Sequence, residues 1–350
     1  MTGNENQVLA FVGANRPGED FMFRTRGVTR SVVVMGLAAI LAVMASLLVA
    51  QAKFPDRPVR IILPFGAGGV ADVTARIVAD RLSDLLGQRF VVENMPGAGG
   101  IQAARAVLSA PADGTTLGLV SNGTAVSAAT FSALPFDPVK DFAMVSTIGT
   151  FDLVFAVNDA SPFKTVADFI AAAKAKPGNL DIGTVSAGST QNLGAELFKS
   201  MADVDVQIVP YKNSPDIVAA LLRNDVQMLV DFPPAIQGQV DARKLRVLAT
   251  SSPSRSSLMP DVPTVAESGL KNYEATAWNG VFAPKGTPEE VIDIVNRALR
   301  EVLTMPEVRS KFEQVGVHAV PSSPAELMGR LTADIKKWNE VVEKAGLQRK

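Results

Sequence analysis

Short apolar runs and longer amphipathic runs alternate along most of this chain. Residues 59–65 and 90–94 are hydrophobic enough and short enough to predict buried strands. Between them, apolar residues recur on one helical face over residues 72–86 and stop at Gly87, which predicts a helix. Strands that alternate with helices in this way are typical of an α/β fold with parallel sheets.

The same alternation predicts two lobes. The apolar stretch 147–157 marks the expected crossing into a second lobe, and residues 275–281 mark the return. We therefore expect residues 53–155 plus 277–350 to form the first lobe and residues 156–276 to form the second. Each lobe is predicted to be a mainly parallel sheet flanked by helices. Two crossings make a hinge, and ligands usually bind in the cleft between two such lobes.

Three capping boxes predict where helices begin, since each has Ser or Thr followed three residues later by an acidic residue. They start at Thr165, Thr287 and Ser323. The second and third boxes also have Pro at the first helical position, which favours a helix start there.

The first 52 residues have a different character. Three arginines within residues 24–30 precede the uncharged apolar run 31–49, and a small-x-small sequence ends at Ala52. This arrangement predicts a secretory signal peptide that is cleaved near Ala52, and hence a periplasmic protein. The alternative is an uncleaved anchor, because the apolar run is just long enough to span a bilayer. Met22 is an alternative start, because it would give a signal of more usual length.

The amino-acid composition excludes several classes of function. The chain has 34 Lys and Arg against 35 Asp and Glu, so no basic excess indicates a nucleic-acid partner. It contains no cysteine, which excludes disulfides, a thiol nucleophile and Cys-ligated metal. The one histidine, His318, cannot make a His-rich metal site. We therefore expect no catalytic residues, no metal site and no cofactor.

Two glycine loops with almost the same letters follow two predicted strands, at residues 66–69 and 97–100. A glycine-rich turn from strand to helix exposes backbone N–H groups, which suit a carboxylate or a phosphate. Neither loop contains Lys or Arg, so backbone dipoles would hold the anion. Two alternatives remain for the first loop, a purely structural turn and a dinucleotide-binding G-x-G-x-x-A fingerprint. Asp72 is expected to be the N-cap of the following helix.

Polar and aromatic side chains at other predicted strand ends are further ligand candidates. Ser186, Ser189 and Thr190 lie between a strand and a helix, where they either meet a ligand or only cap the helix. Tyr211 and Trp278 fall at strand ends or crossings, and such amphipathic aromatics either line a cleft or pack in a core.

Five segments together carry a resemblance to a known family. They are FPDRPVRIILPFGAGG at 54–69, VENMPGAGG at 92–100, PYK at 210–212, DVPTVAE at 261–267, and WNG with APKGTP within 278–288. In this combination the chain resembles the Bug-type (TctC-like) receptors, the extracytoplasmic substrate-binding proteins of tripartite tricarboxylate transporters. The resemblance extends from Phe54 to the C-terminus.

The resemblance implies a periplasmic-binding-protein fold of the Venus-flytrap, type II-like kind that closes on a small carboxylate. In such receptors, two strand-to-helix loops and bridging waters hold one carboxylate; here the loops correspond to residues 65–72 and 186–192. Three positions depart from the family pattern: Ala67 replaces Pro, Met95 replaces Arg, and Asn192 replaces His. The candidate ligand-binding residues are Phe65, Ala67, Gly68, Gly69, Asp72, Ser186, Gly188, Ser189, Thr190, Asn192, Tyr211 and Trp278.

The sequence therefore predicts a monomeric periplasmic receptor that binds a small organic acid without chemistry, for uptake or for sensing. Integral-membrane transporter subunits are the expected protein partners. Two helix N-termini at one cleft would balance about one carboxylate, so we expect a monocarboxylate or a loosely held diacid rather than a tricarboxylate. The alternatives are a Rossmann-type NAD(P)-dependent oxidoreductase and, because of Met95 and Asn192, a sensor that has lost its ligand.

Overall fold

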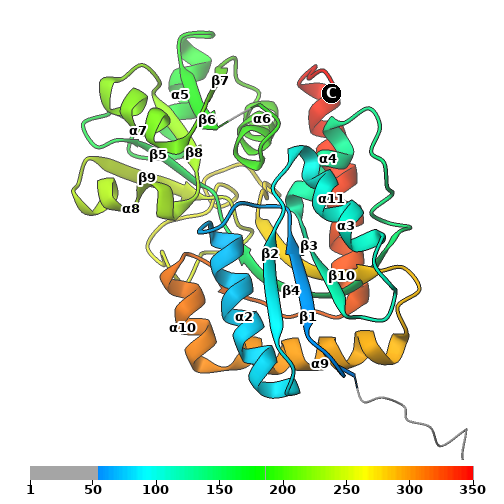
Figure 1. Ribbon diagram of the computed structural model, residues 1–350. Helices are drawn as coiled ribbons and strands as arrows, with labels where there is room; N and C mark the ends of the chain where they lie inside the picture. Colours follow the sequence, from blue (N-terminus) through cyan, green and yellow to red (C-terminus); the bar gives the residue numbers. More distant parts are fainter. Residues whose placement is uncertain (1–53, 186, 350) are drawn as a thin grey trace, which may run out of the picture. The chain divides into compact units, whose positions relative to one another are not determined.

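Within residues 54–185 and 187–349, which the computed structural model describes, the chain forms two β-sheets flanked by helices (Figure 1). The first sheet has six strands in the order β11-β4-β10-β3-β1-β2, and the second has five in the order β7-β6-β8-β5-β9. The predicted α/β class is confirmed. The predicted signal peptide and its cleavage site lie outside the described residues.

The strands of each sheet come from separate parts of the chain. The first sheet consists of β1 (Val59–Leu63), β2 (Phe90–Asn94), β3 (Thr116–Ser121), β4 (Phe142–Phe151), β10 (Ala277–Pro284) and β11 (His318–Ala319). The second sheet consists of β5 (Val154–Asn158), β6 (Asp181–Val185), β7 (Gln207–Tyr211), β8 (Met228–Asp231) and β9 (Leu245–Thr250).

Both sheets are mixed, but most strands of each sheet run in one direction, in agreement with the expected mainly parallel sheets. In the first sheet β1 pairs parallel with β2 and β3, but β10 runs antiparallel between β3 and β4. In the second sheet β6 pairs parallel with β7 and β8, whereas β5 runs antiparallel between β8 and β9. The antiparallel strands β5 and β10 are those that follow the two crossings between sheets, where no crossover helix sets a parallel direction.

Helices cover both faces of each sheet. They are α2 (Val70–Leu86), η1 (Ala98–Gly100), α3 (Ile101–Leu108), α4 (Asn122–Thr130), α5 (Val166–Ala175), α6 (Thr190–Ala202), α7 (Ser214–Arg223), α8 (Pro233–Asp241), α9 (Glu289–Thr304), α10 (Pro306–Gln314) and α11 (Pro324–Lys344). In the first lobe α2, α9 and α10 share one core cluster, whereas α3, α4 and α11 contribute to another. In the second lobe α5 and α6 pack on one face of the sheet and α7 and α8 on the other.

The sequence of strand β1 is apolar almost throughout because the strand packs against helices on both of its faces. Val59, Ile61 and Leu63 pack toward α2 and α9, while Ile62 packs on the opposite face with α3. Successive side chains of a strand point to opposite faces, so a strand covered on both sides is buried on both.

Two of the three predicted capping boxes are present. Thr165 and Ser323 each accept a hydrogen bond from the backbone three residues later, and the acidic side chain reaches back. The box at Thr287 was wrong: α9 starts one residue later with Pro288 as N-cap, and the Thr287 hydroxyl donates to the Pro284 carbonyl.

The two segments that connect the sheets are hydrogen-bonded to each other. The Leu153 N–H donates to Ser251 Oγ at 2.8 Å, and this hydroxyl donates to the Ala275 carbonyl at 3.2 Å. Both bonds are buried, so Ser251 ties the outward and the returning connection together.

None of the helices in the described part of the chain is both long and apolar enough to cross a membrane.

Candidate functional site

A cleft of about 710 Å³ lies where loops from both sheets meet. The first lobe lines it with residues that follow β1, β2 and β3, and the second lobe with residues that follow β6 and β8. The residues that line the cleft include Phe65, Gly66, Ala67, Gly69, Gly97, Gly99, Ser121, Asn122, Thr124, Phe131, Phe151, Gly188, Ser189, Thr190, Gln191, Phe232 and Asn279. Among the described residues, no Asp, Glu, Lys, Arg or His lines this cleft.

The first of the two predicted loops connects β1 to α2. Gly68 has a φ of +83°, a conformation that side chains other than glycine rarely adopt, and it turns the chain into the helix. Gly69 is the N-cap of α2 and brings no side-chain oxygen to the first turn. The backbone N–H groups at the start of α2 therefore face the cleft without a side-chain cap.

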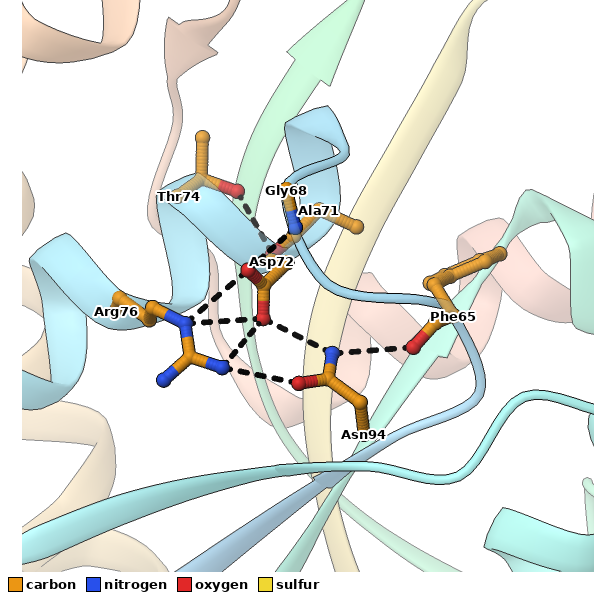
Figure 2. Close-up of polar contacts among 7 residues, drawn as sticks. All are labelled: Phe65, Gly68, Ala71, Asp72, Thr74, Arg76 and Asn94. Carbon is orange, nitrogen blue, oxygen red and sulfur yellow. Dashed lines mark hydrogen bonds and ion pairs between the residues drawn. The ribbon is translucent and has the colours of Figure 1, made fainter.

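Hydrogen bonds to the Asp72 carboxylate hold this loop in place (Figure 2). The carboxylate accepts hydrogen bonds from the Gly68 N–H at 2.9 Å, from Arg76, and from the Asn94 amide at 2.9 Å. The same Asn94 amide donates to the Phe65 carbonyl at 3.0 Å, so the end of β2 is tied to the loop after β1. Asp72 is therefore not the N-cap that the sequence analysis expected; it lies in the first turn of α2.

The Asp72 carboxylate is ionised over the physiological range. Burial by itself would raise its pKa, but the hydrogen bonds from Arg76, the Gly68 N–H and Asn94 outweigh that effect and lower the pKa to about 2. This negative charge is matched by the Arg76 guanidinium, one helical turn away, at 2.9 Å. Asp72 thus stabilises the loop and does not line the cleft.

The second loop connects β6 to α6 and repeats this geometry in the other lobe. Gly188 has a φ of +76°, and its N–H donates to Asn192 Oδ1 at 2.9 Å. The N-cap Ser189 has φ −78° and ψ 166°, against −77° and 167° at Gly69. Asn192 therefore occupies the place that Asp72 has in the first loop, without a charge.

The two loops differ in how their helix starts are capped. The Ser189 hydroxyl accepts from the Asn192 N–H at 3.1 Å and donates to the Val185 carbonyl at 2.9 Å. The capping role that the sequence left open for Ser189 is thus present, and Ser189 also lines the cleft. Ser186 lies outside the described residues.

A third group of lining residues surrounds the start of α4. Ser121 caps this helix, and the Asn122 amide donates to the Thr190 hydroxyl at 2.6 Å, a direct hydrogen bond between the lobes. Thr124 lies in the same turn. These residues were not among the predicted ligand contacts, although a polar stretch directly after the apolar strand β3 is the signal that points to them.

The glycine loop after β2, at residues 97–100, both lines the cleft and packs tightly. Gly97 and Gly99 lie in the lining. A Cβ at Gly99 would come within 3.0 Å of the Phe131 ring, so the small residue also lets this ring approach the backbone. The structural and the ligand-facing interpretations of this loop are therefore compatible.

Tyr211 and Trp278 are not brought into the cleft. Trp278 is fully buried, and its Nε1–H donates to Asp334 Oδ2 in α11 at 2.6 Å. Tyr211 ends β7, the edge strand of the second sheet, and packs with the core of α7 and α8. Asn279, the residue after Trp278 in β10, does line the cleft. The two side chains point to opposite faces of the sheet because neighbouring side chains of a strand alternate.

The remaining candidates lie in the two loops. Phe65, Ala67, Gly69, Gly188, Ser189 and Thr190 line the cleft, whereas Gly68, Asp72 and Asn192 form the hydrogen bonds behind it. Gln191, Phe151 and Phe232 also line it and were missed, since nothing in their local sequence marks them as ligand-facing.

Comparison with known proteins agrees with this architecture. The profile of the tripartite tricarboxylate transporter family receptors matches residues 74–347. The chain is 34% identical to protein BugT of Bordetella pertussis over 324 residues, which cover 92% of this chain and 99% of BugT.

Two similar solved structures contain a bound acid. The R. palustris protein Rpa4515 with adipate is 33% identical, with a TM-score of 0.71 over 84% of this chain and 98% of that one. MatC from Rhodopseudomonas palustris with bound malate is 30% identical, with a TM-score of 0.68 over 83% of this chain and all of that one.

Proposed function

The chain belongs to the tripartite tricarboxylate transporter family of periplasmic solute-binding receptors, and we propose that it captures a small organic carboxylate in the cleft between its lobes. The observation that carries this proposal is the pair of matching loops. Each lobe presents a strand-to-helix turn with a positive-φ glycine, and both turns line one uncharged cleft. Adipate in Rpa4515 and malate in MatC support the same ligand class.

The start of α2 is the stronger of the two anion sites. A helix N-terminus carries about half a positive charge, and a capping side chain uses part of its hydrogen-bonding capacity. Gly69 leaves α2 without such a cap, whereas Ser189 caps α6. Together the two termini balance about one carboxylate. We therefore propose that one carboxylate sits against the Phe65–Gly69 turn and is completed by the second loop.

Closure follows from contacts that only the closed arrangement provides. A ligand held by the first loop offers its free oxygen atoms to Ser189 and Thr190 when the lobes approach. Such differential affinity shifts the population toward the closed state. The bond from Asn122 to Thr190 joins the lobes at the same place.

The proposed setting is the periplasm, reached through the predicted signal peptide. We propose a monomer that delivers its ligand to integral-membrane subunits for uptake; a sensing role would use the same closure with a different partner. No catalytic step is required by the site, because the polar groups that the described residues present to the cleft are amides, hydroxyls and backbone groups.

The oxidoreductase alternative has weaker support. A dinucleotide site of this type uses an acidic residue near the end of the second strand to bind a ribose. Glu93 is at that place, but both of its carboxylate oxygens accept from Arg60 at 2.7 Å. The ligand-free sensor alternative predicts a collapsed cleft, whereas about 710 Å³ is open here.

Titration calorimetry and thermal unfolding of the purified protein test the proposal. The panel should contain acetate, benzoate, malate, adipate and citrate, with NAD and NADP as comparison ligands. We expect an organic acid to bind and to stabilise the fold by ~2.7 kcal/mol at one hundred times its dissociation constant. Stabilisation by NAD or NADP without any response to the acids would support the oxidoreductase instead.

A further inference from the structure

We propose that the ligand of this cleft is an aromatic monocarboxylate that carries a neutral hydrogen-bonding group on its ring. This inference rests on the proposed function and adds the chemistry of the ligand body. It is carried by three features of the described lining residues: none of them is charged, four are phenylalanines that come from both lobes, and the amide of Asn279 has no hydrogen-bond partner among them.

The charge of the lining limits the ligand to one carboxylate. Among the described residues, no cationic side chain lines the cleft, so a second carboxylate would find no ion pair there. The Arg76 guanidinium, one helical turn after Asp72 in α2, is already bonded to Asp72 and Asn94. An ionised group that leaves water without a charged or fully hydrogen-bonded partner is strongly disfavoured. The cleft therefore selects against diacids whose second carboxylate lies inside it.

Four phenylalanines give the cleft an aromatic wall. Phe65 and Phe131 come from the first lobe, and Phe65 keeps 36% of its surface exposed. Phe151 ends β4 of the first sheet and Phe232 follows β8 of the second; their ring centroids lie 5.1 Å apart at 58°. A planar aromatic body can contact such rings edge-to-face or in offset stacks, which adds to the free energy of burying apolar surface.

The Asn279 amide adds a polar group to the lining, on the strand that pairs with the one that Phe151 ends. Its residue is only 3% exposed and lines the cleft, yet its side chain forms no hydrogen bond within the described residues. An amide that opens onto the cleft without a protein partner is free to hydrogen-bond with a ligand or with water. An amide both donates and accepts, and it has no charge, so it suits a hydroxyl or carboxamide group. We assign it to the neutral group of the ligand.

The first experiment compares ligand classes by calorimetry at one pH and one salt concentration. The probes are benzoate, 4-hydroxybenzoate and cyclohexanecarboxylate, against terephthalate, malate, adipate and citrate. We expect 4-hydroxybenzoate to bind most tightly, about three- to tenfold tighter than cyclohexanecarboxylate. Terephthalate should be weaker than benzoate, since no cationic side chain among the described lining residues would pair with its second carboxylate.

Variants assign these differences to residues. Phe151→Leu should weaken the aromatic acids about three- to tenfold and leave acetate nearly unchanged. Phe163→Leu, a half-buried phenylalanine outside the cleft, is the matched control. Asn279→Leu should abolish the preference for 4-hydroxybenzoate over benzoate while both still bind. Asn179→Leu, at an exposed position of the second lobe, should change neither value.

The outcomes separate this inference from the proposed function. If malate, adipate or citrate binds more tightly than every aromatic monoacid, the inference is overturned and the receptor function stands. An unchanged preference in Asn279→Leu would likewise overturn the assignment of the amide. If no organic acid binds at all, the proposed function itself fails. Tight aromatic binding that Phe151→Leu weakens and Phe163→Leu does not would support the inference.

Discussion

The backbone N–H of Gly188 donates to Asn192 Oδ1 at 2.9 Å, just as the N–H of Gly68 donates to the Asp72 carboxylate at 2.9 Å, and in both pairs the acceptor lies four positions after the glycine. The two lobes thus use one loop conformation with different side-chain chemistry. In the first lobe Arg76, one turn after Asp72, balances the charge. In the second lobe the residue one turn after Asn192 is Glu196, whose pKa is raised by burial. A neutral amide therefore suits the second loop.

Gly69→Val should abolish ligand binding and leave the fold intact. Gly69 has a φ of −77°, which valine adopts readily, and a Cβ there meets only the Gly66 carbonyl at 4.0 Å. The side chain would instead fill the space beside the uncapped start of α2. We expect a loss of affinity of at least about tenfold, or ~1.4 kcal/mol. Gly238→Val, at an open position on α8, is the control. Equal affinity in the two variants would place the anion site elsewhere.

Asp72→Asn should destabilise the protein at neutral pH. In the folded state the pKa of Asp72 is about 2, below its ordinary value of 3.8, so the ionised form stabilises the fold. This contribution is present above pH 3.8 and disappears as the pH falls toward about 2.

We expect Asp72→Asn to lower the free energy of unfolding at pH 7 by on the order of 1–2 kcal/mol, since the half-exposed Arg76 is screened by solvent. Urea unfolding at pH 7 and at low pH measures this, with the exposed Asp261→Asn as control. The difference from the unaltered protein should shrink as the pH is lowered. A difference that grows on acidification would contradict the assigned role.

The hydrogen bond from Asn122 to Thr190 should couple the lobes energetically. Asn122→Ala and Thr190→Val each remove this 2.6 Å bond, so the double variant should lose little more affinity than the worse single variant. We expect a coupling energy of about 0.5–1.5 kcal/mol in a double-mutant cycle of ligand binding. Strictly additive losses would mean that the two side chains act on the ligand independently.

Trp278→Phe should affect stability and spare binding. The indole N–H donates to the buried Asp334 carboxylate at 2.6 Å, and its removal leaves that oxygen without this donor. We expect the free energy of unfolding to fall by about 1–3 kcal/mol. The dissociation constant should stay within about twofold, because the ring lies outside the cleft. A large loss of affinity at unchanged stability would show instead that the ring contacts the ligand.

Features that depend on a few neighbouring residues could be predicted from the sequence. The capping boxes at Thr165 and Ser323 were found this way, because a cap involves groups only three residues apart. The glycine turn after β1 and the polar loop after β6 were also visible, because in each case a buried strand, a turn and a helix start follow one another directly. The presence of uncharged loops in both halves of the chain was likewise a local property.

What the tertiary structure decided was which side chains share the cleft. Trp278 and Asn279 are neighbours, but strand pairing turns the first into the α11 core and the second into the cleft. Phe151 and Phe232, 81 positions apart in the numbering, meet because Phe151 ends a strand of one sheet and Phe232 directly follows a strand of the other. The face of the sheet on which a side chain lies, and the distant residues that it contacts, depend on strands and helices far away in the sequence. No local sequence pattern encodes them. The sequence alone thus determined the loops, whereas the packing of the two sheets determined what the loops enclose.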